Sequence, residues 1–371
     1  MPNRVEMQTE IVRIIESALS GESDKVEEYS KLLVKRLRKN GEDRFADRIE
    51  RTIKITKKDF ASYATLDELS SQAPKDAESK LSMLEIVNPV VVSDLILEDS
   101  ISESIGQFIS KVNNRKKLQE VGLEPKLSLL LYGPPGCGKT TIANYIAKEA
   151  NLPIVTARLD TIVSSLLGST SKNIRKVFDF ANNKPCILFI DEFDAIAKAR
   201  DNEYEHGELK RVINSLLQSI DQYNNVLIAA TNHSDILDSA VWRRFSTVIE
   251  VKKPTSTEFI KSLMTSIINE FGIPLESEKK NKGVIVENLK DLSPSDIRTI
   301  LISAISNSVI NGEEKVSSVN ILVEIFKSRN HNKIDKRALT EFLNRNSISQ
   351  VNIAERTDQS LRKVKETLSK K

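Results

Sequence analysis

The sequence predicts an α/β fold, in which a parallel β-sheet lies between helices, with further helical segments before and after it. Three short apolar runs, at residues 127–131, 186–190 and 226–230, read as buried strands. Residues 141–150 and 171–181 lie between these runs and have helical patterns. Buried apolar strands that alternate with helices are typical of a parallel sheet that is covered on both faces.

Residues 1–56 are predicted to form a helical domain ahead of this sheet. Apolar residues recur at helical spacing in the segments 11–19, 26–37 and 45–53. Residues 57–82 are polar and have no clear period, so we interpret them as a linker.

Residues 83–250 are expected to form the α/β domain itself, and the chain becomes wholly helical after it. Residues 251–331 are predicted to form a helical lid domain. Thr255 and Glu258 have the spacing of a capping box at the start of one lid helix. Ser293 is expected to cap another helix, with a proline directly after it.

Residues 332–371 are interpreted as a basic tail that resembles a helix-turn-helix. Residues 327–371 carry 12 Lys and Arg against 5 Asp and Glu, while the whole chain of 371 residues has a net charge of only +3. Residues 349–368 read as two helices around a turn, in which Asp358 and Gln359 stand where the motif prefers a glycine and an apolar residue. The basic face suggests contact with DNA. The alternative is a small helical tail with a solvated basic face.

Composition excludes several other classes of protein. The chain has 2 Cys and 3 His, so we expect neither a disulfide framework nor a metal cluster, and a reducing compartment is the default. No apolar run approaches the roughly 18 residues that a membrane span requires. The first residues also lack the apolar core of a signal peptide. We therefore expect a cytoplasmic protein without a membrane partner.

Residues 133–141 read GPPGCGKTT, directly after a predicted strand and at the start of a predicted helix. This is the sequence of a phosphate-binding loop (P-loop, Walker A), whose glycines let the backbone amides surround a phosphate. Lys139 is expected to reach the β- and γ-phosphates of ATP, and the Thr140 hydroxyl to bind Mg²⁺. Cys137 is interpreted as a small residue that binds through its amide, and its thiol suggests sensitivity to thiol reagents. The residues of the loop predicted to bind ATP are Gly133, Pro134, Pro135, Gly136, Cys137, Gly138, Lys139, Thr140 and Thr141.

Polar residues also follow two of the predicted strands. The apolar run 187–190 ends in Asp191 and Glu192, at the carboxyl edge of the sheet, where ligands of such folds bind. Asp191 is expected to hold Mg²⁺ at the nucleotide, and Glu192 to act as the general base on the attacking water. Asn232 follows the strand at 226–230, and we interpret it either as a contact to the γ-phosphate and water or as a turn former.

Arg243 and Arg244 stand next to each other after the last of these segments. One interpretation is a solvated basic pair. The other is a pair of arginine fingers that reach the ATP of a neighbouring subunit, because a guanidinium matches the spread charge of a transferring phosphoryl group.

The order and spacing of these motifs resemble the AAA family of ATPases over about residues 95–310. The matching stretches include LLLYGPPGCGKTT, the Walker B stretch ILFIDEFDAIA and LIAATNHSDILDSAVWRRF. The resemblance implies an ATP-hydrolysing α/β domain with a helical lid, a hexameric ring and active sites that are shared between subunits. It also implies that Asn232 is the first sensor residue. Leu292–Arg298 resembles the second sensor region, but Ser293 or Pro294 replaces the glycine of the family there.

The whole chain is also similar to bacterial AAA ATPases that are paired with a subtilisin-like serine protease in two-component systems linked to phage defence. This resemblance implies a protein substrate, a protease partner and a role in antiviral defence. Leu166 stands where protein-threading rings of the family carry an aromatic pore residue, and it either grips substrate or packs inside a helix. The leading hypothesis is a ring that remodels or delivers a protein. The alternative is a nucleotide-switched DNA-binding module that uses residues 335–371.

Overall fold

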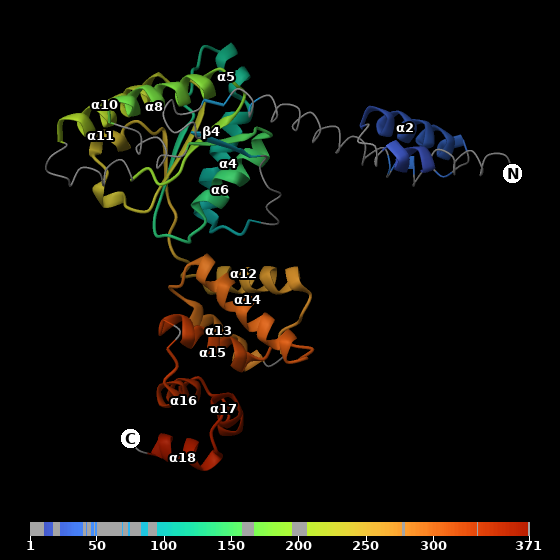
Figure 1. Ribbon diagram of the computed structural model, residues 1–371, viewed down its shortest axis with the longest axis vertical. Helices are drawn as coiled ribbons and strands as arrows, with labels where there is room; N and C mark the ends of the chain where they lie inside the picture. The colour runs from blue at the N-terminus through green and yellow to red at the C-terminus, as the bar shows by residue number, and fades with distance from the viewer. Residues whose placement is uncertain are drawn as a thin grey trace. The chain divides into compact units, whose positions relative to one another are not determined.

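The computed structural model divides the protein into two compact units, Met1–Ala73 and Pro74–Lys371 (Figure 1). In the first unit, α2 (Ser23–Lys39) is amphipathic, and it buries Leu33 and Leu37 on one face. These residues form a small apolar cluster, which is the packing expected of a short helical segment. The second unit contains the sheet and every element described below.

Parts of the chain lie outside the described residues, including most of the predicted linker at 57–82 and the pore position Leu166. The structure describes residues 11–17, 23–39, 42, 46–47, 49, 69, 73–74, 83–87, 95–157, 167–194, 206–276, 279–331 and 333–369.

The second unit is built on a six-stranded sheet with the strand order β1-β3-β4-β5-β2-β6, counted over the described residues. All neighbouring pairs are parallel except β1 and β3, which are antiparallel, so the predicted parallel sheet has one antiparallel edge. The strands β4 and β5 are fully buried, and β2 is buried except at Tyr132, which explains their continuous apolar runs. The strands are β1 (Leu84–Val87), β2 (Ser128–Tyr132), β3 (Ile154–Ala157), β4 (Ile187–Ile190), β5 (Val226–Thr231) and β6 (Thr247–Glu250).

Helices cover both faces of the sheet (Figure 1). α4 (Asp99–Asn113) and α6 (Lys139–Ala150) pack into one apolar cluster with the sheet. α8 (Leu167–Asn182) and α10 (His206–Gln222) pack into another cluster, which takes in the remaining strand residues. The result is the three-layered α/β arrangement expected from the sequence. The short elements at its edges are α5 (Arg115–Glu120), η2 (Ser234–Ile236) and α11 (Ser239–Trp242).

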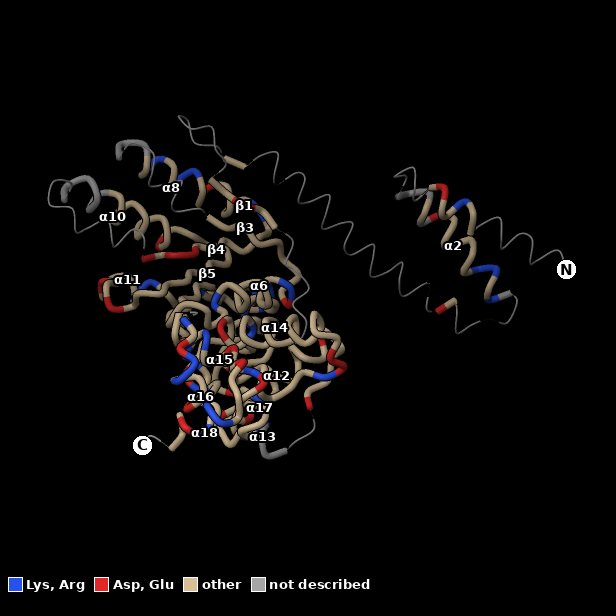
Figure 2. Tube along the Cα trace, turned by 60° about the horizontal axis from the view of Figure 1, so that its bottom comes forward, with Lys and Arg blue, Asp and Glu red and all other residues tan. Residues whose placement is uncertain are grey.

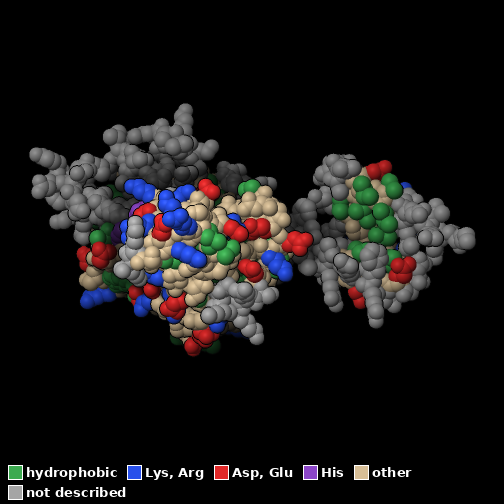
Figure 3. Space-filling view, turned by 90° about the horizontal axis from the view of Figure 1, so that it is seen from below, with side chains coloured by type: hydrophobic (Ala, Val, Ile, Leu, Met, Phe, Trp, Pro, Cys, Tyr) green, Lys and Arg blue, Asp and Glu red, His purple; other side chains and the backbone are tan. Residues whose placement is uncertain are grey.

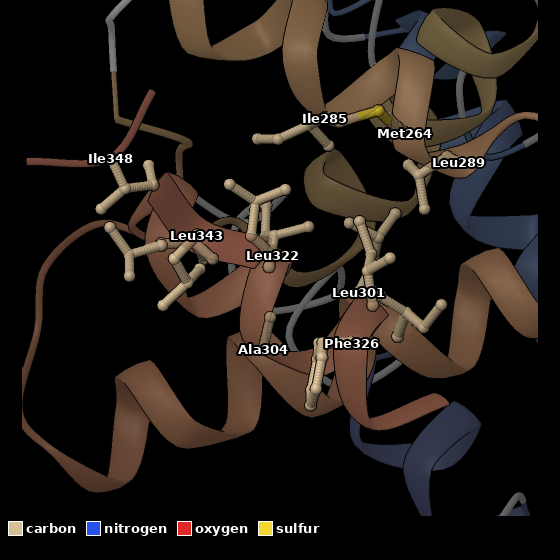
Figure 4. Packing of buried hydrophobic residues seen from close by; sticks show 14 of the residues in the cluster. Met264, Ile285, Leu289, Leu301, Ala304, Leu322, Phe326, Leu343 and Ile348 are labelled. Carbon is tan, nitrogen blue, oxygen red and sulfur yellow. The ribbon is translucent and has the colours of Figure 1, made fainter. Parts of the chain in front are cut away.

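The rest of the unit is helical and shares one apolar cluster, to which both lid residues such as Met264 and Leu301 and tail residues such as Ile348 belong. Leu322 of the lid lies next to Leu343 of the tail (Figure 4). The tail helices therefore extend the core of the lid. None of the described helices is long and apolar enough to span a membrane. The helices are α12 (Thr257–Phe271), α13 (Lys279–Leu289), α14 (Pro294–Ile310), α15 (Ser318–Arg329), α16 (Lys336–Arg345), α17 (Gln350–Thr357) and α18 (Leu361–Ser369).

Two helix caps illustrate how the lid begins. Ser293 caps α14 with a reciprocal capping box to Asp296, as its position before a proline predicts. α12 is capped by Ser256, whose hydroxyl accepts the amide of Phe259, so the expectation of Thr255 as the cap was wrong by one residue. Both residues are suitable caps, and the spacing to the following acidic residue did not decide between them.

Candidate functional site

The phosphate-binding loop connects β2 to α6, and two of its glycines have backbone conformations that side chains do not tolerate. Gly133 has a φ of 141°, and a Cβ there would lie 2.2 Å from the carbonyl oxygen of Val251. Gly136 has a φ of 75°, and a Cβ there would lie 2.7 Å from the hydroxyl of Ser293. The loop therefore packs closely against Val251, directly after β6, and against the start of α14, and this close approach requires glycine at both positions.

Lys139 is the first residue of α6, and its side chain is buried. Its ammonium group donates to the carbonyl oxygens of Gly133 at 2.7 Å and Pro134 at 2.8 Å. Burial lowers the pKa of Lys139, and the nearby Cys137 and Asp191 act in the opposite direction. A buried cation at the amino end of a helix is an arrangement that favours polyphosphate.

Thr140 and Asp191 meet across the carboxyl edge of the sheet. The Thr140 hydroxyl donates to Oδ2 of Asp191 at 3.0 Å, which joins the first turn of α6 to the end of β4. A hydroxyl and a carboxylate are the hard oxygen ligands that Mg²⁺ prefers, and this ion commonly uses one or two protein groups together with phosphates. The donor set therefore fits Mg²⁺ that arrives with ATP. Within the described residues, no group of three or more His, Cys, Asp or Glu side chains forms a separate metal site.

Glu192 lies next to this pair in an unusual backbone conformation. Its φ is 49°, which is in the left-handed region that residues other than glycine rarely adopt. The amide of Glu192 donates to Oδ1 of Asp191 at 2.9 Å, and its side chain is exposed at the edge of the sheet. Strain of this kind is found at functional sites, where it directs a side chain to a particular point.

Asp194 is a residue of the site that the sequence analysis did not single out. It is only 2% exposed, and its Oδ1 accepts the hydroxyl of Thr231 at 2.9 Å and the amide of Asn232 at 3.3 Å. The Thr231 hydroxyl in turn accepts the amide of His233 at 3.1 Å. Asp194 therefore fixes the turn after β5 that carries Asn232. The sequence offered one signal for this role, because Asp194 lies between apolar residues, three positions after Asp191. A carboxylate that is buried at such a position needs hydrogen-bond donors around it.

The two residues predicted as arginine fingers lie in different environments. Arg244 is half-buried, and its Nε donates to Oδ2 of Asp221 at 3.0 Å. Arg243 directly follows α11 and is exposed, and its guanidinium has no hydrogen bond or ion pair with any residue that the structure describes. Neither arginine contacts the loop at Gly133–Thr141 within the described part of its own chain.

A cavity of about 460 Å³ opens beside the loop. Its walls come from the loop at Gly136–Gly138, from the apolar segment 95–97 and from lid residues such as Phe259 and Leu263. The volume and the apolar walls suit the nucleoside part of a nucleotide. The lid reaches the loop directly, because the amide of Ser295 donates to the carbonyl oxygen of Gly136 at 3.1 Å.

Arg298 and Cys137 are among the residues that line this cavity. Arg298, in the region that resembles a second sensor, makes two hydrogen bonds of 2.8 Å to the carboxylate of Glu270, and this pair raises the pKa of Arg298 and lowers that of Glu270. Cys137 is buried, and its burial raises the pKa of its thiol. A thiol that resists ionisation argues against strong sensitivity to thiol reagents.

Comparison of the sequence with known proteins identifies the family of this chain. Residues 129–253 match the model of the ATPase family associated with various cellular activities (AAA). An uncharacterized AAA family ATPase of Sinorhizobium fredii is 36% identical over 226 residues, which are 60% of this chain and 67% of that protein. The chain belongs to the AAA family of ATPases. The motifs that carried the resemblance in the sequence lie within or close to the matched segment.

Other AAA relatives include a proteasome-activating nucleotidase of Saccharolobus islandicus, which is 34% identical over 63% of this chain and 62% of its own length. A putative 26S proteasome regulatory subunit homologue of Methanocaldococcus jannaschii is 33% identical over 59% of this chain and 62% of its own length. The chain thus spans about two thirds of the length of these relatives.

The fold is also similar to that of solved AAA domains. The crystal structure of the FIGL-1 AAA domain matches with a TM-score of 0.54 at 19% identity, and it covers 76% of this chain and 94% of that one. The same domain in complex with ADP matches with a TM-score of 0.52. At this identity, the match concerns the arrangement of the sheet and helices.

Proposed function

We propose that this AAA ATPase works as a ring, most simply a hexamer, in which each ATP is bound by one subunit and hydrolysed with the help of the next. The observation that supports this proposal is the contrast between the two halves of the site. One chain brings together the loop, Thr140, Asp191 and the turn of Asn232, whereas the exposed Arg243 has no partner among the described residues of its own chain. A neighbouring ATP would provide that partner.

The residues of the loop have separate roles in this mechanism. Lys139 exchanges its two loop carbonyls for the β- and γ-phosphates, which are better partners for a buried ammonium group. Thr140 and Asp191 would hold Mg²⁺, which neutralises charge between these phosphates when it is bound. The loop amides surround the phosphate oxygens, and the cavity beside the loop receives the nucleoside.

The residues at the ends of β4 and β5 act on water. Glu192 accepts a proton from the water molecule that attacks the γ-phosphorus, while the bond to the β–γ bridging oxygen breaks and ADP leaves. Asn232 orients this water with its side-chain amide. Arg243 of the adjacent subunit stabilises the charge on the transferring group, an effect worth about 10³–10⁵ in rate.

We further propose that the ring uses ATP hydrolysis to remodel or deliver a protein substrate in the cytoplasm, in partnership with a subtilisin-like protease in bacterial antiviral defence. The relatives named as proteasome-activating nucleotidases support a protein substrate and a proteolytic partner. The resemblance to defence-associated ATPases supports the choice of protease.

A pull-down with Glu192→Gln tests both parts of the proposal. This variant should bind ATP, fail to hydrolyse it and retain substrate and partner proteins that Lys139→Ala, which cannot bind ATP, does not retain. Normal turnover by Glu192→Gln would exclude Glu192 as the base. Identical sets of retained proteins from the two variants would exclude ATP-dependent engagement of a protein.

The second candidate function is DNA binding by the tail at 335–371. The left-handed conformation of Asp358, with a φ of 51°, favours it, since the helix-turn-helix motif usually places a glycine at such a turn. A salt-sensitive mobility shift with the full-length protein tests this function. Deletion of the tail is an unsuitable control, because Leu339 and Leu343 belong to the core of the lid.

A further inference from the structure

The outer face of α18 carries basic residues that take no part in the core. Val364 on its inner face is fully buried, whereas Arg362, Lys363 and Lys365 are exposed, and Leu361 is 43% exposed. Figure 2 and Figure 3 show basic residues at this end of the unit, with acidic residues between them. A charged face on a helix whose other side is firmly packed is a rigid surface for an anionic partner.

The turn before α18 is well defined by hydrogen bonds. Asp358 ends α17 in the left-handed conformation, and the amide of Gln359 donates to the carbonyl oxygen of Ala354 at 3.0 Å. The hydroxyl of Ser360 then accepts the amide of Lys363 at 3.3 Å at the start of α18. The two helices are therefore joined by a fixed three-residue turn, which is the construction of a helix-turn-helix.

Buried contacts hold the two helices in place against the lid. Ile353, Ala354 and Val364 pack into its apolar core. Arg356 of α17 donates to Oε1 of Glu313 at 2.8 Å, and the other oxygen of that carboxylate accepts the buried Ser308 and Asn320. The exposed face of α18 is thus presented by helices that are anchored in the core of the lid, and Oε1 of Gln359 in the turn is buried without a hydrogen-bond partner among the described residues.

We infer that α18 is a recognition helix that lies in the major groove of duplex DNA, with Arg362 and Lys365 on the phosphates or base edges. This inference rests on the proposed DNA-binding function of the tail and goes beyond it by naming the surface and the form of the nucleic acid. The amino-terminal residues of such a helix make the base contacts in helix-turn-helix proteins.

The geometry favours duplex DNA over duplex RNA. α18 has nine residues, and a helix with side chains is about 10–12 Å wide. The major groove of B-form DNA is about 12 Å wide and admits a helix. The major groove of A-form RNA is too narrow for side chains to be read.

The ion pair between Arg362 and Glu366 does not prevent DNA binding. Their atoms lie 3.1 Å apart, but the Arg362 side chain is 90% exposed and its partner 56% exposed. Exposed pairs of this kind are held weakly and exchange readily for a phosphate, which is a stronger partner for a guanidinium.

The test uses full-length protein and a labelled random-sequence DNA duplex, with binding followed by fluorescence anisotropy at several salt concentrations. The variant Arg362→Glu/Lys365→Glu should weaken binding at least about 10-fold and should lower the slope of log K against log salt by about 2, because two phosphate contacts are lost. The control Lys261→Glu/Lys315→Glu has the same change of charge on exposed residues of α12 and of the segment between α14 and α15, and it should bind within about 2-fold of the wild type.

Each outcome decides a separate point. Equal weakening in both variants would reduce the interaction to general electrostatics and overturn the role of α18. Equal affinity for an RNA duplex would overturn the major-groove assignment. If the wild type binds no nucleic acid, the inference and the proposed DNA-binding function both fail, while the ATPase proposal is unaffected. Unchanged ATP turnover and thermal melting of the α18 variant establish that it is folded.

Discussion

Replacement of Asp194 by asparagine is predicted to slow ATP hydrolysis while ATP binding is preserved. Asp194 acts on the turn of Asn232 by accepting the Thr231 hydroxyl and the Asn232 amide. An asparagine keeps one acceptor oxygen and replaces the other by an NH₂ group. The carboxylate charge that strengthens both hydrogen bonds is also lost.

The structure sets the size of the expected effect. A hydrogen bond to a charged group contributes about 1.5–3 kcal/mol, so the weakening of two such bonds should lower stability by about 2 kcal/mol. The melting temperature should then fall by about 4–8 °C. A displacement of the Asn232 amide by about 1 Å should reduce kcat by about 10–100-fold, whereas KM for ATP should change by no more than about 3-fold.

Steady-state ATPase kinetics and nucleotide titration of the assembled protein provide the measurement. Asp235→Asn is the matched control, because Asp235 is exposed in η2, close to the same turn. Thr231→Val should lower kcat in the same direction, and its effect should not add to that of Asp194→Asn, since the two side chains form one hydrogen bond. Full turnover by Asp194→Asn, or loss of ATP binding, would refute the positioning role.

Three other predictions follow from burial and charge in the second unit. Burial lowers the pKa of Lys139, so as pH rises this side chain should lose its charge at a lower pH than an ordinary lysine does. The affinity for ATP should weaken over the same pH range. A Kd for ATP that stays constant up to the pH at which an ordinary lysine titrates would contradict this prediction. Burial raises the pKa of the Glu313 carboxyl, but hydrogen bonds from Arg356 and Ser308 outweigh it and the net pKa is lowered, so its stabilisation should be present at neutral pH and be lost in acid. Glu313→Gln should therefore lower the free energy of unfolding by about 1 kcal/mol in melting experiments at neutral pH. The control is Glu314→Gln, which changes the exposed neighbouring residue and should leave stability unchanged. Burial raises the pKa of the Cys137 thiol and raises that of Cys186 to about 12, so neutral-pH alkylation of the native protein should label neither residue, and rapid labelling would show that the loop opens.

The central sheet and the phosphate-binding loop were predictable because their signals are local. Buried parallel strands read as continuous apolar runs, and the loop needs its glycines, lysine and threonine next to one another in sequence. β1 was not anticipated as an antiparallel edge strand. Its partner β3 lies about 70 residues further on, and nothing within Leu84–Val87 determines the direction in which it pairs.

Pairings between distant residues account for the rest. Asp194 meets Thr231 across 37 positions, and Arg298 meets Glu270 across 28, so neither contact follows from local spacing. The difference between Arg244 and its exposed neighbour likewise depends on Asp221, which is 23 positions away. The helices of the tail at 332–371 were predicted as a segment of their own, without a statement of what they pack against. The period of an amphipathic helix does not determine whether its apolar face packs on neighbouring helices of the tail or on the core of the lid.

An active site that is shared between neighbouring subunits is tested most directly by subunit mixing. Arg243→Ala keeps the base Glu192 but lacks the finger, whereas Glu192→Gln keeps the finger but lacks the base. Each variant alone should bind ATP and be inactive. In an equal mixture, about a quarter of the interfaces should pair an intact base with an intact finger, if the subunits assemble at random.

The mixture should recover roughly a quarter of wild-type turnover, since each restored interface hydrolyses ATP with a finger supplied in trans. Native mass spectrometry of the same sample establishes that the two variants share rings. Mixed rings that stay as inactive as the separate variants would contradict the shared site at Arg243.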